Sequence, residues 1–158
     1  MWSRRVLNVG LGAVLVTGGA LASGVVNFGV SGATTKVHPR LMVSPSGSLK
    51  NSQVVKVRGL HFTPRDTLYL VQCLVKAKDA SGCHVTAPVP VTVNAKGAFA
   101  WTKFTVTTGT VGTGTSASTC GTKRTDLKNC AISAGNAAGG DSAVARITFI
   151  YPTGKNKG

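Results

Sequence analysis

Acidic residues are almost absent from this sequence. Glutamate does not occur, and the only acids are Asp66, Asp79, Asp126 and Asp141, against 18 lysines and arginines. The aspartates form no local pair for general acid–base work, and the three histidines lie far apart with no acid at metal-ligand spacing. Nucleophile-elbow and zinc-protease motifs are also missing. The sequence therefore predicts a protein that is not an enzyme, with no catalytic residues and no metal.

Charge of either sign is missing from a long segment near the start of the chain. Two arginines are followed by residues 6–35, none of which is charged. An apolar run that ends in small residues is typical of an export signal, with cleavage after Ala22 or Ala33. We interpret residues 1–33 as a signal peptide and short linker, and expect a secreted protein. An uncleaved membrane anchor is the alternative, because the segment is long enough to span a bilayer, although its glycines disfavour a helix.

Closely spaced Cys-x-x-Cys pairs, which zinc and redox sites use, do not occur. The cysteines instead form two couples of equal spacing, Cys73 with Cys83 and Cys120 with Cys130. In an exported protein, an even number of cysteines usually forms disulfides. Pairing within each couple would close two short local loops, and we predict the bonds Cys73–Cys83 and Cys120–Cys130.

Helical periodicity is not found, whereas short alternating runs bounded by Gly, Pro, Asn and Asp are frequent. In one of them, Val55 and Val57 alternate with Lys56 and Arg58. This alternation is typical of antiparallel strands with one buried face. Short strands at this density indicate a two-sheet sandwich. The expected strands are Leu41–Ser44, Gln53–Arg58, Thr67–Leu74, Val89–Val93, Ala98–Val106, Asn129–Ser133 and Ala143–Tyr151.

The connections are predicted from their turn residues. The sequence from Asn94 to Gly97 is expected to join its two strands as a hairpin. Residues 107–119 consist of Thr, Gly, Ser and Ala with a single valine, and are expected to form a mobile loop. The folded domain is placed at residues 34–152, followed by a polar tail at 153–158.

Three stretches occur in an order that resembles the neocarzinostatin family of chromoproteins: LMVSPSGSLKNSQVVKVRGLHFTPRDTLYLVQC, then Cys83, then NCAISAGNAAGGDSAVARITF. The resemblance extends from Leu41 to Phe149. It implies an all-β fold, a seven-stranded immunoglobulin-like antiparallel sandwich with two local disulfides. It also implies a secreted, non-enzymatic carrier that holds an apolar enediyne chromophore in a cleft without covalent bonds, with DNA as the target of the cargo. The positions that support it are Val43-Ser44-Pro45, Val54 to Gly59, Gln72-Cys73, Cys83, Cys120, Cys130 and Ala137-Ala138-Gly139.

The resemblance also locates a ligand cleft beside the first disulfide loop. The segments that would border it contain no Phe, Tyr or Trp, so an aliphatic lining is expected where family carriers use aromatic rings. No cofactor is expected other than such a non-covalently bound small molecule. The predicted lining residues are Leu74, Val75, Val85, Pro88, Val111, Ala131, Ile132 and Gly135.

Positive charge supports an alternative function. The family's carriers are acidic, whereas this chain has a net charge of +14. A basic scaffold that binds DNA, cell-wall polymer or lipid without a cargo is therefore a second hypothesis, and its binding would not be sequence-specific. A purely structural extracellular module is a third. We expect a monomer in each case. The candidate basic residues are Lys56, Arg58, Lys103, Lys123, Arg124, Lys128 and Arg146.

Overall fold

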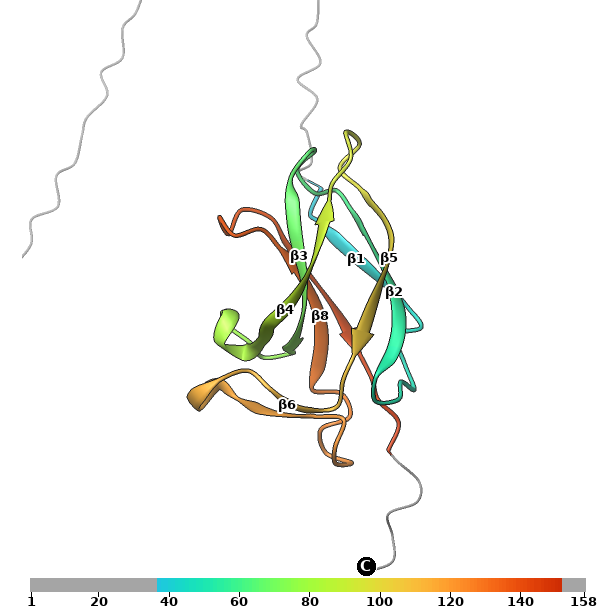
Figure 1. The fold of residues 1–158 in the computed structure, drawn as a ribbon, viewed down its shortest axis with the longest axis vertical. Helices are drawn as coiled ribbons and strands as arrows, with labels where there is room; N and C mark the ends of the chain where they lie inside the picture. The colour runs from blue at the N-terminus through green and yellow to red at the C-terminus, as the bar shows by residue number, and fades with distance from the viewer. Residues whose placement is uncertain (1–36, 152–158) are drawn as a thin grey trace, which may run out of the picture. The chain divides into compact units, whose positions relative to one another are not determined.

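The computed structural model describes residues 37–151, which form an all-β unit (Figure 1). The predicted signal segment and the predicted tail lie outside the described residues. Within residues 37–151, no helix has the length and apolar character needed to cross a membrane. The elements are β1 (Arg40–Ser44), β2 (Gln53–Leu60), β3 (Thr67–Leu74), the 3-10 turn η1 (Ala80–Gly82), β4 (Cys83–Thr92), β5 (Phe99–Val106), β6 (Gly109–Val111), the 3-10 turn η2 (Gly114–Ser116), β7 (Ser118–Cys120), β8 (Cys130–Gly135) and β9 (Ser142–Ile147).

Seven of these strands build two antiparallel sheets. One sheet has the order β1-β2-β5 and the other has the order β4-β3-β8-β9, while β6 and β7 form a separate two-stranded ribbon. In Figure 1, β3, β4 and β8 lie together on one side and β1, β2 and β5 on the other. The disulfides join Cys73 to Cys83 and Cys120 to Cys130. The predicted seven-stranded immunoglobulin-like sandwich with two local disulfides is therefore confirmed.

The core between the two sheets follows the alternation of the strands. Val55 and Val57 of β2 are buried while Lys56 between them is exposed, and β3 buries Leu68 and Leu70 in the same way. Removing these apolar side chains from water is the main term that holds the two sheets together. The core also contains Leu49, Phe62, Val91, Val93, Phe99, Phe104, Val106, Val111, Ile132, Ala134, Ile147 and Phe149.

The turn at Asn94 corrects one prediction. Its side-chain Oδ1 accepts the backbone N–H groups of Lys96 (2.9 Å) and Ala98 (3.1 Å), and Gly97 adopts a φ of 74°. Such a tight turn was expected to close a hairpin within one sheet. However, β4 pairs with β3 and β5 pairs with β2. The turn is therefore a corner at which the chain passes from one sheet to the other.

The segment at residues 107–119 corrects a second prediction, that of a mobile loop. It contains the antiparallel pair β6 and β7 rather than a loop without structure. Its single valine, Val111, is buried in the core, and the Thr113 N–H donates to the Ser81 carbonyl at 2.8 Å. Composition alone suggested a mobile loop because a glycine- and threonine-rich segment has few groups to bury. One buried side chain and the hydrogen bonds to η1 provide the missing contacts.

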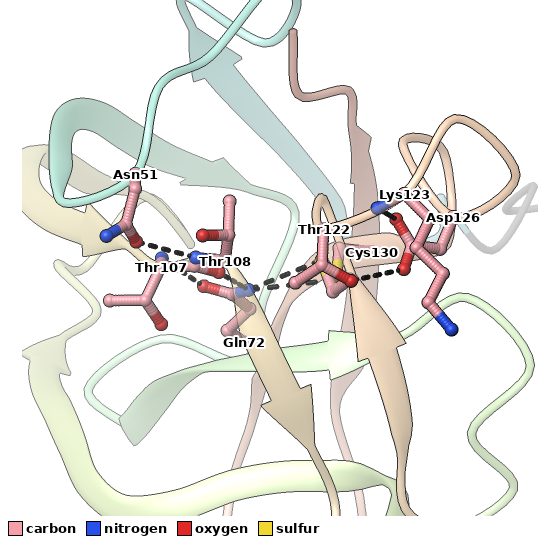
Figure 2. The surroundings of a disulfide bond; sticks show 9 residues. Asn51, Gln72, Thr107, Thr108, Thr122, Lys123, Asp126 and Cys130 are labelled. Carbon is pink, nitrogen blue, oxygen red and sulfur yellow. Dashed lines mark hydrogen bonds between the residues drawn. A yellow bond between two sulfur atoms is a disulfide. The ribbon is translucent and has the colours of Figure 1, made fainter. Parts of the chain in front are cut away.

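The buried amide of Gln72 on β3 contacts both Thr107, which precedes this ribbon, and the second disulfide (Figure 2). The Gln72 Nε2 donates to the Thr107 carbonyl at 2.7 Å, and the Thr107 N–H donates to Gln72 Oε1 at 2.9 Å. The same Nε2 lies 3.7 Å from the sulfurs of Cys120 and Cys130. Gln72 is thus a buried polar residue whose amide is fully partnered, as buried polar groups must be.

Replacing Gln72 by leucine is expected to reduce the free energy of unfolding by about 1–3 kcal/mol, because the N–H and carbonyl of Thr107 lose their partners. Urea denaturation followed by fluorescence measures this difference. Gln53→Leu is the control, since Gln53 accepts only the Lys50 N–H at an exposed position. Equal losses in the two variants would show that the buried amide contributes nothing specific.

Asp126 organises the turn between β7 and β8 (Figure 2). Its carboxylate accepts the Thr122 hydroxyl at 2.7 Å and the Lys123 N–H at 2.8 Å. Burial raises the pKa of Asp126, but hydrogen bonds from Thr119, Lys123 and Thr122 outweigh burial, and the pKa lies below its ordinary value. The carboxylate form therefore stabilises the folded state.

The sign of this pKa shift predicts a pH dependence. A depressed carboxyl pKa contributes stability that is present above the unfolded pKa, about 3.9, and is lost as the pH falls through the lower folded pKa. The variant Asp126→Asn should melt at a lower temperature than wild type at pH 7, and the gap should narrow below about pH 4. Thermal melts at pH 7, 4 and 3 test this. A gap that stays constant with pH would show that charge on Asp126 has no part in stability.

Candidate ligand-binding pocket

A pocket of about 650 Å³ lies on the outer face of the four-stranded sheet. Alternation along β3 buries Leu68, Leu70 and Gln72 in the core and turns Tyr69, Val71 and Cys73 outward into the pocket, whose floor they form with residues of β8 and β9. The volume lies within the range of small-molecule sites, about 300–1,000 Å³. The floor residues from β8 and β9 are Ser133, Gly135, Ser142 and Val144.

One wall is the connection from β3 to β4, which the first disulfide closes. Asp79 caps η1 by accepting the Ser81 N–H at 2.8 Å. Hydrogen bonds from the side chain and backbone of Ser81 hold the pKa of Asp79 below its ordinary value. Cys83 follows η1 directly and is bonded to Cys73 on β3. This arrangement holds Lys78, Asp79 and Ala80 against the pocket.

The opposite wall is the turn between β8 and β9. The Asn136 Nδ2 donates to the Asp66 carboxylate at 2.7 Å, and its Oδ1 accepts the Gly140 N–H at 2.9 Å. Gly139, with a φ of 74°, allows the chain to turn back. The turn is therefore attached to the start of β3, and Asn136, Ala137 and Gly139 line the pocket.

Of the eight predicted lining residues, the structure places five around this pocket: Leu74, Val75, Val85, Pro88 and Gly135. The other three do not line it. Val111 and Ile132 point into the core between the sheets. Ala131 lies opposite Cys73 in the β3–β8 register but is fully buried. The prediction assigned whole segments to the cleft without separating the two faces of each strand, which accounts for Val111 and Ile132, whereas Ala131 shares its face with Cys73 but is buried.

Sequence reasoning missed the residues of the pocket that belong to the outward face of the sheet. Tyr69, Val71 and Val144 are the largest of them, and Tyr69 is 40% exposed. The lining therefore contains an aromatic ring, contrary to the expectation that it is wholly aliphatic. The period-two alternation of the strand from Thr67 to Leu74 was the signal that could have found it.

The lining of the pocket is chemically suited to non-covalent binding. Apolar side chains from three strands form most of its surface, and the charged groups Lys78 and Asp79 lie on one wall. In residues 37–151, no group of three or more His, Cys, Asp and Glu is arranged to hold a metal ion. Both cysteines at the pocket are in the disulfide. Such a lining can enclose an apolar molecule and orient it by a few polar contacts.

The predicted basic residues do not form one patch. Lys56 and Arg58 on β2 share the outer face of the three-stranded sheet with Lys103 on β5, where Lys56 and Lys103 are direct partners. The remaining four lie elsewhere: Lys123, Arg124 and Lys128 between β7 and β8, and Arg146 on β9.

Comparison with known proteins supports the same fold and the same family. The model of the neocarzinostatin family matches residues 41–149, which is most of the chain. This chain belongs to the neocarzinostatin family. Among solved structures, macromomycin is 27% identical, with a TM-score of 0.55 over 71% of this chain and 99% of macromomycin. Apokedarcidin is 25% identical, with a TM-score of 0.49 over 72% of this chain and all of its own. No curated protein matches.

Membership explains why the sequence resemblance and the fold agree. The matched residues begin in β1 and end just beyond β9, so both sheets and both disulfides lie within the family's region. The neocarzinostatin-family fold is that of the enediyne carrier apoproteins. The pocket described above is formed entirely by residues of this region.

Proposed function

We propose that this protein is a carrier that holds an apolar small molecule in the pocket on the outer face of the four-stranded sheet. Binding is non-covalent, and the protein performs no reaction on its cargo. An enediyne chromophore, whose own target would be DNA, is the cargo class that family membership supports. The carrier acts as a secreted monomer.

One observation supports this function above the others: apolar side chains are exposed inside a concavity. Tyr69, Val85 and Val144 are 40%, 47% and 61% exposed, and all three line the pocket. Exposed apolar side chains that gather in a hollow are typical of a ligand site rather than of an ordinary surface. A bound apolar molecule would remove these side chains from water.

The polar groups of the pocket support carriage rather than catalysis. Lys78 and Asp79 are on one wall, and the Asp79 carboxylate is engaged by Ser81. A carboxylate that caps a turn and has a depressed pKa is a poor general base at neutral pH. The polar groups therefore supply orientation and solubility at the pocket rim.

The test is to purify the protein from the medium of its producing cells and to compare its native mass with its mass after denaturation. Extra mass that is lost on denaturation is expected, and its absorbance identifies the class of cargo. As a second measurement, the purified chain should take up the neutral dye Nile red with a blue-shifted emission. A bare chain that also fails to bind the dye would contradict carriage.

Binding of an anionic polymer is the second candidate function. Its support is the +14 charge together with the positions of the aspartates, whose carboxylates accept hydrogen bonds from backbone groups and neutral side chains. Within residues 37–151 these carboxylates are thus engaged by neutral groups, and the lysines and arginines there can attract an anionic partner. Retention on immobilised heparin that falls steeply with added salt is the expected result, and a response independent of salt would contradict it.

A further inference from the structure

The outer face of the three-stranded sheet collects cations from all three strands. It is defined here as the basic sheet face: Arg40 on β1, Lys56 and Arg58 on β2, and Trp101 and Lys103 on β5. The sequences of these strands, RLMVS, QVVKVRGL and FAWTKFTV, contain no acidic residue. The face therefore carries four positive charges with no carboxylate on the same strands.

Two of these cations lie directly opposite each other on neighbouring strands. Lys56 and Lys103 are direct partners in the β2–β5 register, and both are exposed. Side chains directly opposite each other on antiparallel strands have Cβ atoms about 4.5–5.5 Å apart, and like charges there are destabilising. A negatively charged group bound between the two ammonium groups would relieve this repulsion.

The third cation is held in place by its neighbours. Arg58 lies between Met42 of β1, its register partner, and Trp101 of β5. Its Nε donates to the Met42 Sδ at 3.3 Å, and its guanidinium carbon lies 5.4 Å from the centre of the Trp101 ring. These contacts restrict the side chain, so less conformational entropy is lost when the guanidinium binds an anion.

We propose that the basic sheet face binds the phosphate backbone of nucleic acid without sequence preference. The inference makes the second candidate function specific and rests on it, and it is independent of carriage. Several phosphates at regular spacing can be contacted at once by cations distributed over three strands. Trp101, which is 46% exposed, adds a ring on which an unpaired base can stack.

The contacts of Met42 and Trp101, two apolar side chains of the face, favour nucleic acid over an anionic membrane. Peripheral membrane binding combines cations with apolar side chains that insert among the lipids. Met42 and Trp101 instead flank Arg58 and hold it through the contacts just described. On this face they serve to position a cation rather than to penetrate a bilayer.

The test compares two double variants that remove the same charge from different places. Lys56→Gln with Lys103→Gln changes the basic sheet face, and Lys123→Gln with Lys128→Gln changes the turn between β7 and β8. Binding of each full-length chain to a fluorescent 20-base-pair duplex is followed by anisotropy from 25 to 200 mM salt. The first variant should bind more weakly, and its plot of log affinity against log salt should be less steep by about 2. The second variant should change neither the affinity nor the slope appreciably.

Each outcome has a clear meaning. Equal losses in both variants would show that the duplex responds to total charge, which overturns the basic sheet face but keeps polyanion binding. A wild-type chain that binds neither the duplex nor heparin overturns both the basic sheet face and polyanion binding. A first variant that loses binding to phosphatidylserine vesicles while keeping its affinity for the duplex would make the face a lipid site. In Trp101→Leu, a selective loss of affinity for single-stranded DNA is the expected sign of stacking.

Discussion

Replacing Val71 by glutamate should weaken the binding of an apolar ligand about tenfold or more. Val71 lies on the pocket floor, where β3 pairs with Ser133 of β8. A bound apolar molecule would cover the new carboxylate without offering it a partner, and burying an unpaired charge costs more than the roughly 1.4 kcal/mol that corresponds to tenfold in affinity. Titration with Nile red, or with the native cargo once it is isolated, measures the change.

The matched control is Val54→Glu. Val54 is also an exposed valine in the middle of a sheet, but it lies on β2, in the other sheet. It introduces the same charge away from the pocket and should leave the dissociation constant unchanged. If both variants lose affinity equally, the dye binds through the net charge or through a surface other than this pocket. If neither does, Val71 is not part of the ligand site.

Removing the first disulfide should both destabilise the fold and impair the pocket. The loop from Cys73 to Cys83 has a sequence separation of 10, and in the loop-entropy account its loss lowers the free energy of unfolding by about 3 kcal/mol. The same loop carries η1 and the wall with Lys78 and Asp79. The variant with alanine at both cysteines should therefore unfold at lower denaturant and bind the ligand more weakly while still folded.

The second disulfide supplies an internal control. The loop from Cys120 to Cys130 has the same sequence separation of 10, so its removal should cost a comparable amount of stability. Neither cysteine lines the pocket. Urea denaturation together with dye titration in buffer separates the two effects. A loss of affinity that is identical in both double variants would mean that the pocket responds only to global stability.

The sheets and disulfides could be predicted because their signals are local. Alternation of Val55 and Val57 with Lys56 and Arg58 identifies a strand with one buried face, and the structure buries the two valines. Equal spacing of the cysteines indicated the pairing that the structure shows. These features depend on neighbours along the chain and on short loops, which a sequence displays directly.

The candidate site was less predictable because its residues come from only one face of several strands, and adjacent residues on the same strand face the core. Ile132 and Ser133 are adjacent in sequence, but the first faces the core and the second lines the pocket. Tyr69 enters the site only because β8 lies beside β3, with β9 on the far side of β8. The corner at Asn94 was missed for the same reason, since the local turn does not reveal which strand will be the partner on either side.

Two layers of strands also separate the two surfaces proposed here. The pocket belongs to the outer face of one layer and the basic sheet face to that of the other, so they point away from each other. Packed sheets lie about 10 Å apart, and residues this distant contribute additively to stability. Substitutions on one layer can therefore accumulate without altering the other. Evolution could therefore change the cargo of the pocket while the basic sheet face keeps its affinity for nucleic acid. It could equally add positive charge to the basic sheet face while the pocket stays the same.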